Sequence, residues 1–185
     1  LLDVSRITQG KITLHREAVE LGKTLEHSLE IVRPLIDSKR HALSVHVPDT
    51  PVWVFGDFSR LSQIFSNVLH NAAKYTTDGG SIEFDVVVDR GSVAVRVRDN
   101  GIGIEPQFLP HVFEVFTQGY RGLDRSQGGL GVGLAVVRRL IELHQGEVNI
   151  TSDGPGLGTE VSIRLPCITE VVQEAGAQAP TPPAC

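Results

Sequence analysis

Apolar residues recur at helical spacing in some stretches of the chain and alternate with polar residues in others. The helical spacing predicts three main helices, over residues 20–39, 57–76 and 130–144. The alternation predicts strands over residues 42–47, 52–55, 81–88, 92–99, 147–151 and 158–165, with a short edge strand over 11–14. From residue 100 to residue 133 glycine is frequent, and Pro106 and Pro110 break regular structure. A loop of that length inside a compact domain usually has a function or is mobile.

Three local signals refine these elements. Asp57 offers an N-cap for the second helix, and Asp89-Arg90-Gly91 separates two alternating segments as a hairpin turn. Pro34 lies within the first helix, where it predicts either a kink or a break.

The helix over residues 57–76 combines an apolar face with a polar stripe. Its apolar positions are Leu61, Ile64, Phe65, Val68, Leu69 and Ala72. Asn67, Asn71 and Lys74 follow one another at i, i+4 and i+7 along the edge of that face, within a sector of about 60°. A carboxamide oxygen can ligate Mg²⁺, and a lysine can meet a phosphate as a point charge. By itself, the polar stripe is explained equally well as a side of the helix that faces solvent and binds no ligand.

Two glycine-bearing stretches are candidates for a nucleotide site. Asp99-Asn100-Gly101-Ile102-Gly103-Ile104 follows a strand, and a buried carboxylate at that strand end could accept a hydrogen bond from an exocyclic amine, selecting adenine over guanine. A plain turn is the alternative. Residues 128–134 read GGLGVGL and lead into a helix, whose free N–H groups could receive phosphates. They match neither a Walker A motif nor a Rossmann fingerprint.

Composition and charge narrow the class of protein. The chain has 185 residues, of which 41% are hydrophobic and 21% charged, as expected of one soluble domain with appendages. The net charge of −5 argues against a nucleic-acid partner, and no apolar run is long enough to cross a membrane. The two cysteines predict free thiols in a reducing compartment, hence a cytoplasmic piece, with a membrane anchor in the parent left open.

In this order, the motifs resemble the catalytic, ATP-binding domain of sensor histidine kinases, in the GHKL ATPase superfamily shared with gyrase. The asparagine helix resembles the N box, DNGIGI the first glycine box, FEVF at residues 113–116 the F box, GGLGVGL the second glycine box, and GLGT at residues 156–159 the last small motif. The resemblance implies an α+β fold: a two-layer α/β sandwich of Bergerat type, with a mixed sheet of about five strands and three helices on one face.

The resemblance also implies a role for each matching residue. Asn71 would ligate Mg²⁺, and Asn67, Lys74 and Tyr75 would contact phosphates or ribose. Asp99 would bind the adenine amine, with Thr159 behind it. The base pocket would be lined by Gly101, Gly103 and Ile104. The phosphates would be covered by Arg125, Gly129, Leu130, Gly131 and Gly133. Phe113 and Phe116 would anchor a mobile lid to the core.

The resemblance predicts three segments. Residues 1–10 would end the second helix of a dimerisation and phosphoacceptor domain, residues 11–166 would form the catalytic domain, and residues 167–185, rich in Ala and Pro, a disordered linker. The first residue is not Met, so we expect a piece of a longer protein. Its partners would be the parent's phosphoacceptor domain and a response regulator or downstream receiver domain of a hybrid kinase.

One departure limits the chemistry expected of this piece. None of the seven histidines stands in a phosphoacceptor context, so no catalytic residue is expected in the fragment itself. His70, beside Asn71, reads as a surface residue. The leading hypothesis is a Mg·ATP site that donates its γ-phosphoryl group to a histidine on another domain. The alternatives are a nucleotide-sensing regulatory module without kinase activity and a GHKL-type ATPase. An ATPase would want a carboxylate at position 67, where the chain has Asn.

Overall fold

The computed structural model describes residues 12–114 and 132–168. Its elements in chain order are β1 (Glu17–Glu20), α2 (Leu21–Ser38), β2 (Ala42–His46), β3 (Trp53–Gly56), α3 (Phe58–Tyr75), β4 (Ser81–Asp89), β5 (Ser92–Asp99), the 3₁₀ turn η1 (Leu109–His111), α4 (Gly133–Leu143), β6 (Glu147–Thr151) and β7 (Thr159–Pro166). Within these described residues, none of the helices combines the length and apolar character needed to span a bilayer.

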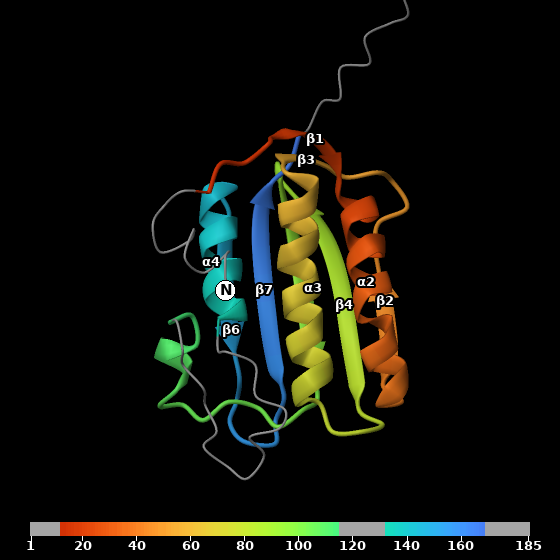
Figure 1. Ribbon diagram of the computed structural model, residues 1–185, viewed down its shortest axis with the longest axis vertical. Helices are drawn as coiled ribbons and strands as arrows, with labels where there is room; N and C mark the ends of the chain where they lie inside the picture. The colour runs from red at the N-terminus through yellow and green to blue at the C-terminus, as the bar shows by residue number, and fades with distance from the viewer. Residues whose placement is uncertain (1–11, 115–131, 169–185) are drawn as a thin grey trace, which may run out of the picture.

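The main sheet has five strands in the order β2-β4-β5-β7-β6. β2 runs parallel to β4, and the other neighbouring pairs are antiparallel, so the sheet is mixed. The three α-helices of the described residues cover one face, with α3 between α2 and α4 (Figure 1). This arrangement confirms the predicted sandwich. A second, two-stranded sheet pairs β1 with β3 at one end of the helical layer.

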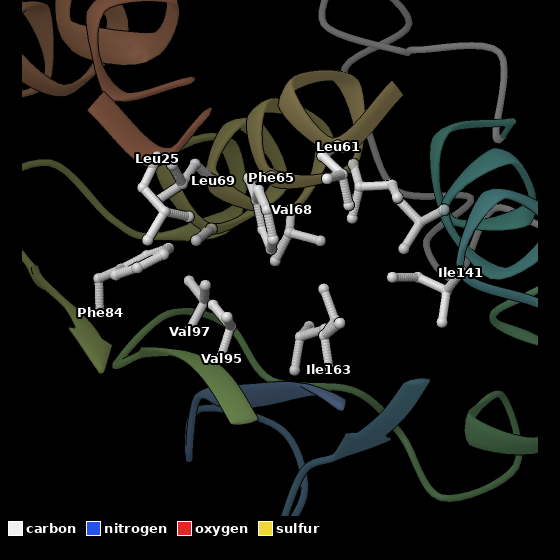
Figure 2. Packing of buried hydrophobic residues seen from close by; sticks show 14 of the residues in the cluster. Leu25, Leu61, Phe65, Val68, Leu69, Phe84, Val95, Val97, Ile141 and Ile163 are labelled. Carbon is white, nitrogen blue, oxygen red and sulfur yellow. The ribbon is translucent and has the colours of Figure 1, made fainter. Parts of the chain in front are cut away.

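The core lies between α3 and the middle strands. Ile64, Phe65, Val68 and Leu69 of α3 are all fully or almost fully buried, as the helical spacing predicts. They meet Phe84 of β4 and the inward-facing valines of β5 (Figure 2). Asp57 begins α3 as its N-cap, since its Oδ1 accepts the N–H of Arg60 at 3.1 Å.

The structure tests two local predictions, a strand over residues 11–14 and a kink or break at Pro34. The edge strand over residues 11–14 is wrong in its described part, because residues 12–16 form no strand. The strand is instead Glu17–Glu20, which finds hydrogen-bonding partners in β3. Pro34 does not split α2, and it lies on the exposed side of the helix.

Beyond Pro166 the chain continues to pair with β3. Cys167 forms a β-bridge with Val54, and the N–H of Ile168 donates to the carbonyl of Trp53 at 2.7 Å.

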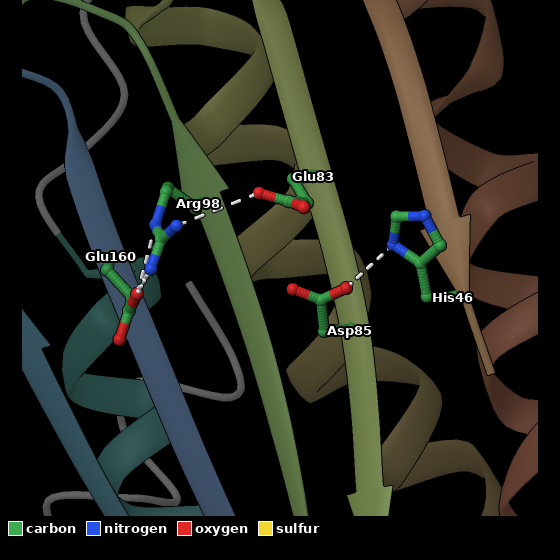
Figure 3. Close-up of polar contacts among 5 residues, drawn as sticks. All are labelled: His46, Glu83, Asp85, Arg98 and Glu160. Atoms are coloured by element: carbon green, nitrogen blue, oxygen red, sulfur yellow. Dashed lines mark hydrogen bonds and ion pairs between the residues drawn. The ribbon is translucent and has the colours of Figure 1, made fainter. Parts of the chain in front are cut away.

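The face of the sheet opposite the helices carries paired charges. His46 Nδ1 lies 2.7 Å from Asp85 Oδ1 on the neighbouring strand (Figure 3). Arg98 of β5 lies between two carboxylates, 2.5 Å from Glu160 and 3.8 Å from Glu83. These contacts are exposed or half-exposed, so each contributes little to stability.

Candidate functional site

The loop that follows β5 is bound to the end of α3. The N–H of Ile102 donates to the carbonyl of Tyr75 at 3.1 Å. Gly101 is so close to the same carbonyl that a Cβ on Gly101 would lie 2.4 Å from the Tyr75 oxygen. A residue with a side chain would force the two segments apart. Glycine here thus joins the first glycine-rich motif to the C-terminal end of the asparagine helix.

Asp99 lies at the end of β5, half-buried, with its carboxylate held by backbone groups. Its Oδ1 accepts the N–H of Gly101 at 2.8 Å, and the N–H of Thr159 donates to it from the neighbouring strand β7. Burial raises the pKa of Asp99, and these two hydrogen bonds oppose that rise in part. A carboxylate fixed in this way is a directional acceptor, as the recognition of an amine requires.

The turn between β6 and β7 closes over the same loop. Gly103 has φ +66°, and a Cβ there would lie 2.0 Å from the carbonyl oxygen of Gly154. Gly158 has φ +74°, and a Cβ there would lie 2.0 Å from the carbonyl oxygen of Asp99. Both positions therefore need glycine for conformation as well as for space. Two loops that are distant in sequence pack backbone to backbone around Asp99.

Asn71 lies against the start of α4. A Cβ on Gly133, the first residue of that helix, would stand 3.9 Å from the Asn71 side-chain nitrogen. The N-cap Val132 makes no side-chain cap hydrogen bond, so the first N–H groups of α4 are not satisfied by their own cap residue. The positive end of a helix dipole and a carboxamide thus come together, a combination that suits phosphate oxygens and a hard cation.

Of the other predicted residues of α3, Lys74 and Tyr75 lie in its last turn and Asn67 lies near its middle. Lys74 Nζ stands 4.9 Å from the centroid of the exposed Tyr75 ring, and Asn67 lies half-buried one turn before Asn71. His70 is exposed, as expected, and desolvation of its ring by neighbouring atoms together with the charge of Lys74 lowers its pKa. The C-terminal half of α3 thus presents amide, ammonium and phenol groups.

Part of the predicted site lies outside the described residues. Arg125, Gly129, Leu130, Gly131 and Phe116 belong to this part. Phe113 is described, and it is half-buried with the guanidinium of Arg138 over its ring, 5.7 Å from the centroid. Phe113 thus contacts the exposed Arg138 of α4, and its role as an anchor to the core stays a prediction.

Two residues that support the site were missed in the sequence. Lys39 Nζ donates to the carbonyls of Lys74 at 2.8 Å and Thr76 at 3.2 Å, so it satisfies the C-terminal end of α3 from the end of α2. Ser152 bonds to both loops around Asp99. No local signal could have identified them, because a lysine at a helix end and a serine before Asp-Gly are ordinary in sequence.

Comparison with known families gives one match that covers more than half of the chain. The profile described as "Histidine kinase-, DNA gyrase B-, and HSP90-like ATPase" matches residues 56–169. That range contains the asparagine helix and all the glycine motifs.

Individual relatives and solved structures agree with this match. Sensor histidine kinase RcsC of Escherichia coli (strain K12) is 34% identical over 90% of the chain and 17% of its own length. Sensor protein GacS of Pseudomonas syringae pv. syringae is 35% identical over 95% of the chain and 20% of its own length. The chain thus spans about a fifth of the length of these relatives.

Among solved structures, the mycobacterial sensor histidine kinase MprB superposes with a TM-score of 0.70 at 35% identity, covering 82% of this chain and 97% of that one. Full-length ShkA in complex with AMPPNP gives a TM-score of 0.74 at 28% identity, covering 91% of this chain and 35% of that one.

Proposed function

Because the chain belongs to the histidine kinase-, DNA gyrase B- and HSP90-like ATPases, we propose that it binds Mg·ATP and donates the γ-phosphoryl group to a histidine on a separate dimerisation domain. The observation that carries this proposal is the position of Asp99, whose carboxylate is fixed by two backbone N–H groups between glycine loops too close to admit a side chain. Such a site accepts a flat heterocycle with an amine at its edge.

Within this proposal, the base and the phosphates bind at opposite ends of one surface. Asp99 accepts the exocyclic amine of adenine, while Gly101, Gly103 and Ile104 line the pocket. The N–H groups at the start of α4, which Val132 does not cap with its side chain, bind phosphate oxygens. Lys74 supplies a positive charge to the phosphates. The protein's contribution to phosphoryl transfer is then mostly positioning and charge neutralisation.

Asn71 is the residue that fits Mg²⁺. Its carboxamide lies beside the start of α4, so its oxygen could ligate a cation that also touches the phosphates. When bound, Mg²⁺ would neutralise the charge that develops on the phosphoryl oxygens. Asn67 and Tyr75 would contact phosphates or ribose from the same helix. Arg125 and residues 129–131 would cover the phosphates.

Kinase chemistry is preferred to ATP hydrolysis because of position 67. A hydrolase of this superfamily would want a carboxylate on the asparagine helix to activate water, and Asn67 has an amide that cannot accept a proton. The acceptor would be a histidine in the parent's dimerisation domain, and a response regulator or receiver domain would act downstream. A cytoplasmic location follows from this role.

Two measurements on the 185-residue chain, made one after the other, test the proposal. Titration calorimetry should show binding of ATP in the presence of Mg²⁺, and its absence would refute the nucleotide site. Incubation with γ-labelled ATP should then label the parent's dimerisation segment, supplied as a separate polypeptide, with acid-labile phosphate.

The chain alone should remain unlabelled, since none of its histidines has a phosphoacceptor context. Binding without transfer to the added segment would favour a nucleotide-sensing module. Steady phosphate release without the added segment would favour an ATPase. Stoichiometric acid-labile label on the chain alone would show that the acceptor lies within it.

A further inference from the structure

The hydroxyl group of Ser152 joins two loops that meet around the carboxylate of Asp99. Ser152 directly follows β6 and is half-buried. Its Oγ donates to the carbonyl of Gly158 at 2.6 Å and accepts the N–H of Ile104 at 2.9 Å. Ser152 itself belongs to the β6–β7 loop, where its Oγ also lies 3.4 Å from the carbonyl oxygen and from the N–H nitrogen of Gly154. The bond from Ile104 is the one that reaches the other loop.

The same two loops supply the groups that orient Asp99. The N–H of Gly101, three residues before Ile104, donates to its Oδ1 at 2.8 Å. The N–H of Thr159, the residue after Gly158, also donates to the carboxylate. In each loop, the residue that hydrogen-bonds to Ser152 is thus at most three residues from the residue whose N–H donates to Asp99.

The bonds that otherwise join these loops run between backbone groups. Gly156 N–H donates to the carbonyl of Ile102 at 2.7 Å, and Gly158 N–H donates to that of Gly101 at 3.2 Å. The second of these is long for a strong hydrogen bond. The short Ser152 contact to Gly158 lies within the β6–β7 loop and fixes Gly158 beside this long cross-loop bond, while the Ser152 contact to Ile104 adds a second bond between the loops.

We propose that Ser152 is a positioning residue for base recognition, which sets the orientation of Asp99 through the two loops and so determines how strongly the site prefers adenine to guanine. The inference rests on the proposed nucleotide site. An acceptor discriminates between bases only while it points at the group that adenine has and guanine lacks. Without the hydroxyl, the N–H donors of Gly101 and Thr159 lose their common support, and the carboxylate can rotate away from the base.

The experiment compares Ser152→Ala, Ser152→Thr and wild type in the full chain, measuring ATP affinity by calorimetry and GTP affinity by competition. Loss of one supporting hydrogen bond should weaken ATP binding by about three- to tenfold in Ser152→Ala. GTP binding, which gains nothing from an acceptor at Asp99, should change by less than about twofold, so the ATP/GTP ratio falls. Ser152→Thr retains the hydroxyl and should restore the ratio.

A matched control is Ser92→Ala at the opposite end of β5. Ser92 Oγ also donates to a backbone carbonyl, that of Asp89, at 2.9 Å. This variant should bind both nucleotides as wild type does. Adding Ser152→Ala to Asp99→Asn should cause little further loss, because a residue that acts through Asp99 has nothing left to orient.

The possible failures are separable. If wild type binds no Mg·ATP, the proposed nucleotide site is wrong. If wild type binds and Ser152→Ala retains the wild-type ATP/GTP ratio, or adds its full loss to that of Asp99→Asn, the role of Ser152 is wrong and the site stands. If Ser152→Ala does not fold, Ser152→Cys, which keeps the volume but donates weakly, takes its place under the same criteria.

Discussion

The backbone N–H of Asp57 donates to Nε2 of His144 at 3.1 Å, which joins the first residues of α3 to the end of α4. The other ring nitrogen, Nδ1, donates to the carbonyl of Leu140 at 2.7 Å. These two contacts fix a neutral imidazole, since Nε2 can accept only without its proton. The side chain is buried.

Acidification should therefore destabilise the domain through His144. Burial is the largest cause and lowers the pKa of His144. The hydrogen bond to the Leu140 carbonyl, which comes next, raises that pKa, the positive charge of Arg16 lowers it further, and the charge of Asp57 raises it least. Below the ordinary histidine value of about 6.5, the unfolded chain binds a proton that the folded state resists. The free energy of unfolding should thus fall as the pH drops from about 6.5 toward the lowered pKa, and stay flat above 6.5.

Urea unfolding at pH 7.5 and at pH 5.5 measures this effect. His144→Gln retains a neutral acceptor without a titrating ring and should show a smaller loss of stability between the two pH values. The exposed His27→Gln is the control and should behave as wild type does. An equal pH dependence in His144→Gln and wild type would contradict this role of His144.

Asp99→Asn should weaken ATP binding substantially without destabilising the fold. The amide loses the negative charge and turns a donor toward the adenine amine, a loss of about 1.5–3 kcal/mol. Because burial raises the pKa of Asp99, its ionised form costs folding energy at neutral pH, and the neutral variant should be at least as stable as wild type. Calorimetry and thermal unfolding measure the two effects. Unchanged ATP affinity would remove Asp99 from the adenine site.

Asn71→Ala should reduce the effect of Mg²⁺ on nucleotide binding. The variant loses a carboxamide oxygen beside the start of α4 but keeps the base pocket. ADP without metal should bind the variant nearly as well as wild type, while added Mg²⁺ should improve binding less. Calorimetry with ADP, with and without Mg²⁺, gives the comparison. A Mg²⁺ effect of wild-type size would place the metal on other residues.

Gly101→Ala should destabilise the loop around Asp99 and abolish tight ATP binding. The added methyl would lie 2.4 Å from the Tyr75 carbonyl oxygen and 2.8 Å from Asp99 Oδ1, so backbone must move. Overpacking of this kind costs about 1–3 kcal/mol. Gly22→Ala is the matched control. Gly22 lies in α2, where Ala is favoured, and the nearest atom to the added methyl would be Glu20 Oε1 at 3.8 Å. A Gly101→Ala variant as stable as Gly22→Ala would refute the close packing.

The sequence by itself determined the elements whose cause is local. The apolar spacing of α3, its cap at Asp57 and the hairpin of β4 and β5 all follow from neighbouring residues, and each is found in the structure. The order of the motifs was sufficient to indicate the family and the layered fold. The residues of the site were named from that resemblance, and their roles in binding await the experiments above.

The tertiary structure decided what depends on segments distant in sequence. The amino-acid sequence does not reveal that β2 pairs in parallel with β4. It also does not reveal that β1, and not residues 11–14, forms a strand, because strand pairing depends on which partner edge is free. It does not show that Asn71 meets Gly133, or that Ser152 lies between two glycine loops. A hydroxyl's partners are set by where the folded backbone places donors and acceptors, and residue type and local spacing do not encode that position.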